Sequence, residues 1–180
     1  INTSTVLDTL LEGESVSKEW NLFSSLKYHF TPFFIQYFDI YTTNYRADEF
    51  LNTKDDQLFD DNYFDHKLVK SELRTSITMK KTNLMTGFGR SRDILDRKDF
   101  LNVHAQDLVF AYTQIDGKVG FIDFIIGSRY DNYLESQSSF SNKIALGLSF
   151  LERIKFNGSI ATGFKMPDFR QRYFNFTNFF

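Results

Sequence analysis

Most of this chain alternates apolar and polar residues with a period of two, and that period restricts it to β-strands. Between His66 and Met79, for example, Val69, Leu73 and Ile77 alternate with charged or hydroxyl side chains. Successive side chains of a strand point to opposite faces, whereas a helix repeats every 3.6 residues. The 22 Phe and 9 Tyr residues also favour strands. We therefore predict an all-β fold.

The alternation recurs along the chain and predicts an antiparallel, up-and-down sheet of about eight strands. The predicted strands are 18–30, 33–46, 66–79, 84–95, 103–115, 118–132, 142–151 and 154–164. Residues before Lys18 are predicted to be irregular, as the tail of a loop or of a preceding strand, and Ala47 to Asp65 to form a long acidic loop. Asp116-Gly117 is a strong signal for a two-residue hairpin.

The predicted connections alternate between short and long. Short reversals are expected near Thr31, Lys81, Asp116 and Glu152, and longer connections near Asp56, Asp96 and Gln137. Outer-membrane barrels show this asymmetry, with short periplasmic turns and longer extracellular loops. The alternation therefore favours a membrane barrel over a soluble sandwich.

The two predicted faces differ in chemistry. One carries Leu, Ile, Phe, Val and Tyr, and the other mostly small or charged residues. A barrel with a lipid-facing exterior and a wet interior gives this pattern, and so does a soluble sheet with one buried face. In the strand 103–115, we expect Leu108, Phe110 and Tyr112 on the apolar side.

The segment Ser159 to Asn178, SIATGFKMPDFRQRYFNFTN, resembles a barrel motif of TonB-dependent outer-membrane receptors, most closely the Bacteroidetes-type members. The matching residues are Gly163, Phe164, Lys165, Pro167, Asp168, Arg170, Gln171 and Asn175. Met166 and Arg172 stand where family members usually have a small and an aliphatic residue. In this motif, Pro167 marks the end of a strand because proline lacks the N–H group that a ladder needs.

The resemblance implies that residues 1–180 are a partial barrel domain, about eight strands from a barrel of about 22. It implies uptake of a scarce ligand of the ferric siderophore, haem or cobalamin class across the bacterial outer membrane. The implied partners are outer-membrane lipid, lipopolysaccharide, a plug domain and the TonB complex, without a cofactor. Nothing in the chain matches a plug domain or signal peptide, so we expect a fragment of the receptor.

Ligand-binding candidates are cations and aromatic residues at predicted strand ends or in the final loop, because these groups suit anionic, conjugated ligands. They are Tyr45, Arg46, Arg129, Arg170, Arg172 and Tyr173. Two other interpretations stay open. Arg129 can pair with Asp131 on the inner face, and loop cations can contact lipopolysaccharide.

Other function classes find little support. The net charge of −2 gives no electrostatic reason to expect a nucleic-acid partner. The chain has no cysteine, and its three histidines lack metal-ligand spacing. No nucleophile sits in a recognisable catalytic frame, so we expect no enzyme. No apolar run approaches the roughly 18 residues of a spanning helix, so a membrane crossing requires strands.

Two rival classes remain. The first is a complete small barrel of eight strands with a structural or adhesive role, although its narrow interior would need larger side chains than the predicted Gly, Ala and Ser. The second is a soluble, lipocalin-like carrier, which requires apolar residues inside and polar residues outside.

Overall fold

The computed structural model describes residues 11–53, 57–134, 137–150, 154–167 and 172. Eight strands form one antiparallel sheet in the order of the chain. They are β1 (Leu11–Thr31), β2 (Phe34–Thr53), β3 (Leu58–Met79), β4 (Thr82–Arg97), β5 (His104–Val119), β6 (Ile122–Tyr133), β7 (Ser138–Phe150) and β8 (Ile154–Ala161). The predicted all-β, up-and-down antiparallel sheet is therefore confirmed.

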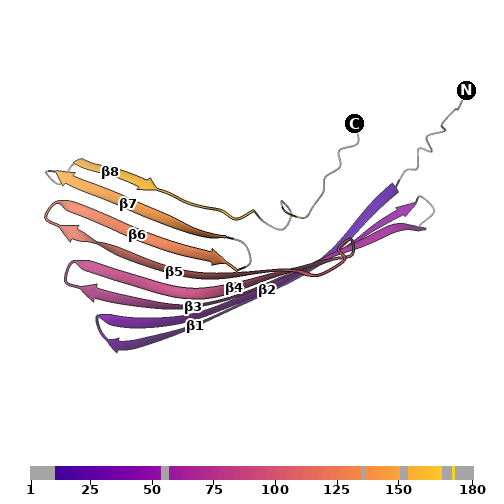
Figure 1. Cartoon of the computed structure of the whole chain (residues 1–180), viewed down its shortest axis with the longest axis horizontal. Coiled ribbons are helices and arrows are strands. Elements are labelled where there is room, and N and C mark those ends of the chain that lie inside the picture. The colour runs from indigo at the N-terminus through magenta and orange to yellow at the C-terminus, as the bar shows by residue number, and fades with distance from the viewer. Residues whose placement is uncertain (1–10, 54–56, 135–136, 151–153, 168–171, 173–180) are drawn as a thin grey trace, which may run out of the picture.

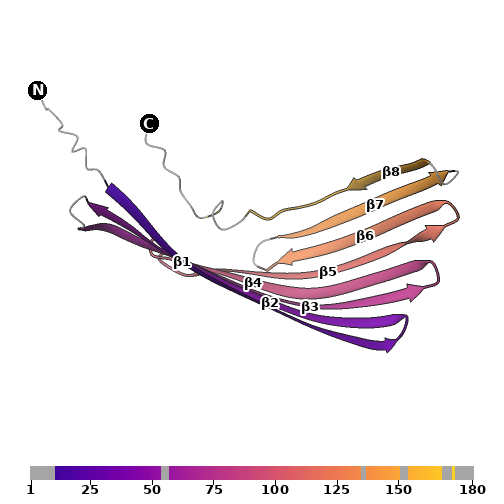
Figure 2. The same cartoon turned by 180° about the vertical axis from the view of Figure 1, so that it is seen from behind.

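The sheet is a single curved layer with β1 and β8 at its edges, as Figures 1 and 2 show from opposite sides. β1, β2 and β3 have 21, 20 and 22 residues, and they continue well past the ends of β6 and β7, which have 12 and 13. One end of the sheet therefore carries the four short turns, and at the other end the first strands extend beyond the later ones.

The alternation of connections is confirmed, but the long connections are shorter than predicted. Two or three residues join β1 to β2, β3 to β4, β5 to β6 and β7 to β8, whereas four to six join the other pairs. Most of the predicted acidic loop is strand, because β2 and β3 stay paired as far as Leu51 and Asp60, before a register irregularity and a last pair of Asn52 with Leu58. Residues 11–17, predicted to be irregular, belong to β1.

The Asp116-Gly117 hairpin prediction is wrong. Gly117 lies within β5 and pairs with Phe124, and the chain reverses at Gly120-Phe121 instead. Gly120 has a φ of 61°, which glycine adopts without a steric penalty. A Cβ atom on Gly117 would lie 2.8 Å from the carbonyl oxygen of Lys81, so this glycine permits a close approach of strands rather than a turn.

Successive hairpins are displaced along the sheet. The first residue of β2 pairs with a residue of β3 two positions before the end of that strand, and the same holds for β4 with β5 and for β6 with β7. These pairs are Phe34 with Ile77, Thr82 with Gly117, and Ile122 with Leu148. Each pair of strands thus adds a stagger of two residues, or one residue per strand.

One face of the sheet, which we call the apolar face, carries Leu26, Leu73 and Phe88, and the opposite polar face carries Asp39 and Glu72. A charge-free stretch crosses the apolar face of every strand, and we call it the apolar band. It comprises the apolar-face positions of 20–28, 34–44, 69–79, 82–88, 109–119, 122–132, 140–148 and 156–160.

The apolar face is uncovered. Leu26, Phe88 and Ile160 are 66%, 61% and 76% exposed, whereas the only buried apolar side chains of the described residues are Ala47, Leu95 and Phe110. A soluble domain buries its apolar side chains in a shared core between layers. In this single layer the apolar side chains of that face stay exposed instead.

The predicted orientation of β5 is wrong. Phe110 and Tyr112 lie on the polar face, because Phe110 pairs with Gly89 and Asp131, and Tyr112 reaches Glu72. Leu108, two residues earlier in the same strand, shares that face.

Candidate functional site

Two glycines of β4 allow two aromatic rings of β5 to lie across the polar face. A Cβ atom on Gly87 would stand 2.6 Å from Cζ of Tyr112, and one on Gly89 would stand 2.6 Å from Cζ of Phe110. A side chain at Gly87 would displace the Tyr112 ring, and one at Gly89 would meet both the Phe110 ring and, still closer, the backbone oxygen of Ser71. The two glycines of this β4 segment thus leave the space that the rings of β5 occupy.

The Tyr112 ring crosses β4 and reaches β3. Its Oη atom donates a hydrogen bond of 2.5 Å to Oε1 of Glu72, and Lys70 Nζ lies 2.9 Å from Oε2 of the same carboxylate. The Phe110 ring, only 1% exposed, has two cations over it: Arg129 Cζ at 4.5 Å and Lys70 Nζ at 5.1 Å from the centroid. These contacts tie β3 and β6 together across β4 and β5.

The charges of this region balance. Lys70 pairs with Glu72, Arg74 with Asp39 at 3.3 Å, and Arg129 with Asp131 at 2.7 Å. We call these six residues, together with Phe110 and Tyr112, the polar-face cluster. Each of its three cations has a carboxylate partner, so the cluster has no net charge to attract an anion. Its chemistry suits a rigid polar wall more than a binding pocket.

The predicted ligand-binding residues are not brought together. Arg129 belongs to the polar-face cluster and donates three hydrogen bonds of 2.7 to 3.0 Å to Asp131, as the alternative interpretation expected. Tyr45 is on the polar face of β2, opposite His66 and well along the strand from the cluster. Arg172 is exposed, and Arg170 and Tyr173 lie outside the described residues.

Arg46 points to the other side of the sheet from Tyr45, since consecutive residues of a strand face opposite ways. Its Nη2 atom lies 2.9 Å from Oδ1 of Asp48, and its guanidinium lies 5.4 Å from the centroid of Tyr63. Hydrogen bonding from Arg46 holds the pKa of the Asp48 carboxyl below its ordinary value. Arg46 is therefore partnered on a surface that does not face Arg129.

The family-like motif begins where β8 ends. β8 stops at Ala161, three residues earlier than predicted, and Thr162 makes the last backbone hydrogen bond, to Asn142 O at 2.8 Å. Gly163, Phe164, Lys165 and Pro167 follow without a strand ladder, with the Phe164 ring 6.4 Å from that of Tyr133. The motif residues Asp168, Arg170, Gln171 and Asn175 lie outside the described part of the chain.

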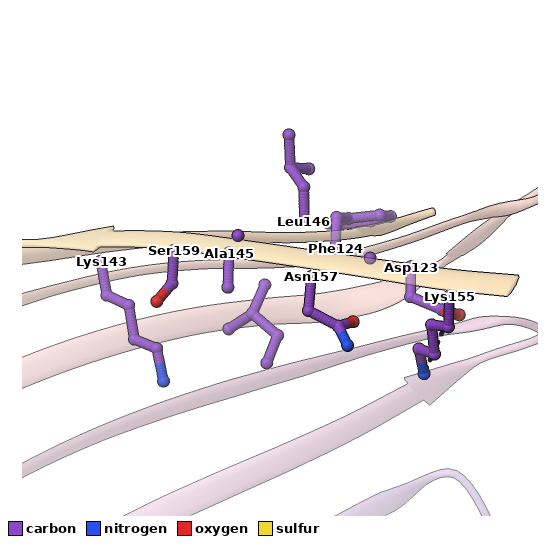
Figure 3. A pocket seen from close by; sticks show the side chains of 11 residues that line it. Asp123, Phe124, Lys143, Ala145, Leu146, Lys155, Asn157 and Ser159 are labelled. Carbon is purple, nitrogen blue, oxygen red and sulfur yellow. Dashed lines mark ion pairs between the residues drawn. The ribbon is translucent and has the colours of Figure 1, made fainter. Parts of the chain in front are cut away.

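The polar face has a hollow of about 400 Å³ over β6, β7 and β8. Figure 3 shows Lys143, Asp123, Lys155 and Asn157 on the side of the sheet away from Leu146. Small residues leave this space unfilled: Ala145, Gly147 and Ser159 line it. Lys155 Nζ lies 3.8 Å from Asp123 Oδ2, and a second hollow of about 300 Å³ shares Lys143.

The sequence interpretation missed the polar-face cluster, although its signal was present. Gly87 and Gly89 share one face of β4, and Phe110 and Tyr112 share one face of the next strand. Two glycines spaced by two, followed by a strand with two aromatic residues spaced by two, indicate rings lying over glycines. Orienting the aromatic residues outward hid this pairing.

Among the described residues, no group of three or more His, Asp or Glu side chains is placed to hold a metal ion. The same part of the chain contains no helix with the length and apolar content of a membrane span. No family model matches the chain, and no curated protein matches it. The fold and its two chemically different faces therefore carry the functional argument.

Proposed function

We propose that this chain is part of the transmembrane barrel of a TonB-dependent receptor in the bacterial outer membrane. The observation that carries the membrane assignment is the apolar band, which is free of charge on all eight strands and exposed. Side chains facing lipid must be apolar, while the backbone pairs within the sheet.

The height of the band fits a bilayer. On β3 it runs from Val69 to Met79, which at about 3.4 Å per residue spans about 34 Å along the strand. A stagger of one residue per strand, about 3.3 Å for every 4.8 Å across the sheet, corresponds to a tilt of about 35°. The tilted band is then about 28 Å high, close to the roughly 25 to 30 Å of a hydrocarbon core.

The edges of the sheet favour a larger barrel over a closed barrel of eight strands. Unpaired edges are removed when a sheet closes on itself. β1 has 21 residues and β8 has 8, so direct pairing would leave most of β1 without a partner. The hollows over β6 to β8, lined by small residues, also fit a wide interior better than a narrow one packed with side chains. We infer that further strands, to a total of about 22, complete the barrel.

The transport role rests on the motif around Gly163 and Pro167. By that resemblance, the receptor takes up a ferric siderophore, haem or cobalamin, a plug domain fills the polar interior, and the TonB complex supplies energy. Tyr45 and the cations of the final loop are the ligand-contact candidates of this proposal, whereas Arg129 serves the wall.

Two experiments test the proposal. The chain, produced whole, is expected to fold in phospholipid vesicles or detergent micelles and to aggregate in plain buffer, because both its apolar face and its edges need cover. A monodisperse folded monomer in plain buffer would refute the membrane assignment. The reading frame around the 180 residues tests the receptor: a plug domain upstream and further strands downstream support it, whereas a signal peptide directly before Ile1 and a stop after Phe180 refute it.

A further inference from the structure

On β1 to β4 the first charges beyond the apolar band share one sign, whereas on β5 the first charge is the carboxylate of Asp107. At the end where β1 to β3 extend, the first charged residue on the apolar face of each of β1, β2, β3 and β4 is a cation. These residues are Lys18, Arg46, Lys67 and Arg90. Carboxylates on the same face, such as Asp48, Asp65 and Asp96, come further from the band. The border of the band on β1 to β4 is therefore positively charged.

The charge is densest on β3 and β4. Arg90 and Arg92 follow the band on β4, and Lys67 on β3 is the diagonal neighbour of Arg92, which pairs with Val69. Arg90 and Arg92 are 55% and 53% exposed, and Lys67 is exposed as well. We call these three residues the border cations.

The carboxylate of Asp107 contacts two of the three border cations, Arg90 and Arg92. Arg90 donates from Nε at 3.1 Å and from Nη2 at 2.7 Å to Oδ1 of Asp107, and Arg92 Nε lies 4.0 Å from Oδ2. Within the described residues, no other carboxylate lies within 4 Å of the border cations. Three cations and one carboxylate leave a charge of +2. Asp107 thus orients the guanidinium groups without neutralising them.

We propose that Lys67, Arg90 and Arg92 bind the phosphate group of an anionic membrane lipid at this border. The inference rests on the proposed membrane function, because it places the border cations at the depth of the lipid headgroups. Guanidinium groups match the oxygens of a phosphate with paired N–H donors, and lysine adds a point charge. The aliphatic stems of all three side chains remain along the apolar band.

The fluorescence of Trp20 can report which lipid lies next to the border cations. It is the only tryptophan of the chain, it is 53% exposed on the apolar face, and it lies in the same row as Lys67, with Asn44 between them. Two strand spacings separate the row positions of Trp20 and Lys67, about 10 Å. The chain is refolded in phosphatidylcholine vesicles that contain a small fraction of either brominated phosphatidylcholine or brominated phosphatidylglycerol, and quenching of Trp20 is compared.

Stronger quenching by the phosphatidylglycerol is expected, with a preference that falls about fivefold for each border cation replaced by glutamine. The control replaces Lys80, Lys81 and Lys118 by glutamine, an equal loss of charge at the hairpin end, and should retain the preference. Equal quenching by both lipids in the unaltered chain, or loss of the preference in the control, would overturn the lipid site.

Two further outcomes separate the alternatives. Inorganic phosphate in the buffer is compared with a phosphate-free salt of equal ionic strength. If only the phosphate abolishes the preference, the border cations bind free phosphate and the lipid assignment is wrong. If neither brominated lipid quenches Trp20, the chain is not inserted and the proposed membrane function fails with it. Quenching by phosphatidylcholine without any preference refutes only the lipid site.

Discussion

A positive charge placed on the apolar band should cost most at the centre of the band and least at its borders. β5 offers three apolar-face positions for this test: Val109 at one border, Thr113 near the centre and Val119 at the hairpin border. Val109 and Val119 are 42% and 65% exposed, and Thr113 is exposed too. Each is changed to arginine, so that strand, face and introduced charge stay constant.

The expected magnitudes follow from depth. Thr113 lies four residues from Val109 and six from Val119, about 13 Å and 20 Å along the strand. Arginine at the midplane of a membrane barrel costs about 2 to 4 kcal/mol, against about 0 to 1 near the interfaces. Thr113→Arg should therefore lower the folding equilibrium constant about 30-fold to 900-fold. Val109→Arg and Val119→Arg should lower it less than about sixfold.

Urea unfolding in phospholipid vesicles, followed by Trp20 fluorescence and circular dichroism, measures these costs. Thr113→Gln is the control for side-chain size and polarity without charge, and it should stay close to the unaltered chain. Three small and equal costs would mean that the face is in water. Three large and equal costs would mean that another protein layer covers it. Either result refutes the membrane band.

Three further predictions concern the polar face, the extended strands and the edges. Gly87→Ala should destabilise the sheet by about 1 to 3 kcal/mol in the same unfolding assay, because its Cβ would stand 2.6 Å from Tyr112. Gly158→Ala meets no atom within 4 Å and should change stability by less than about 1 kcal/mol. Arg46→Gln should raise the pKa of Asp48 toward its ordinary value, measured by carboxyl-carbon NMR, since Arg46 lowers it. The Asp48 pair thus contributes stability above the unfolded-state pKa and loses it as pH falls through the lower folded pKa. Sedimentation of the whole chain without detergent should show self-association through the edges of β1 and β8, and a monomer would contradict it.

The sequence was sufficient for the strands, their order and most of the two faces, because side-chain alternation is a local property. Val69, Leu73 and Ile77 are strongly apolar, the residues between them on the other face are charged or hydroxylated, and that strand was oriented correctly. The orientation of β5 was predicted wrongly, because the apolar face of this strand carries the small or weakly apolar side chains of Ala111 and Thr113. The position of Phe110 on the other face depends on a glycine in the adjacent strand, which the alternation within β5 does not reveal.

The extent of the strands was also hard to predict. Where β2 and β3 pass beyond the apolar band, both faces carry charges, and such a segment has the composition of a loop. Pairing between Ala47 and Phe64 nevertheless continues the ladder, since a strand in water needs hydrogen-bond partners but no apolar face. The prediction of the candidate site failed for a related reason. Tyr45 and Arg46 were grouped because they are adjacent in sequence, but consecutive residues of a strand lie on opposite faces.

In the proposed receptor, the extension of β1, β2 and β3 would affect access from outside the cell. β2 continues from the border position Asn44 to Thr53, which is about 30 Å along the strand beyond the border of the apolar band. In a receptor of the proposed kind, this part of the barrel would be a rigid, hydrogen-bonded sheet that projects above the membrane. An antibody, or an epitope spliced between β2 and β3, would meet the protein well clear of the surrounding sugars and headgroups. The same projecting sheet would also set the width of the barrel entrance, independently of any loop movement.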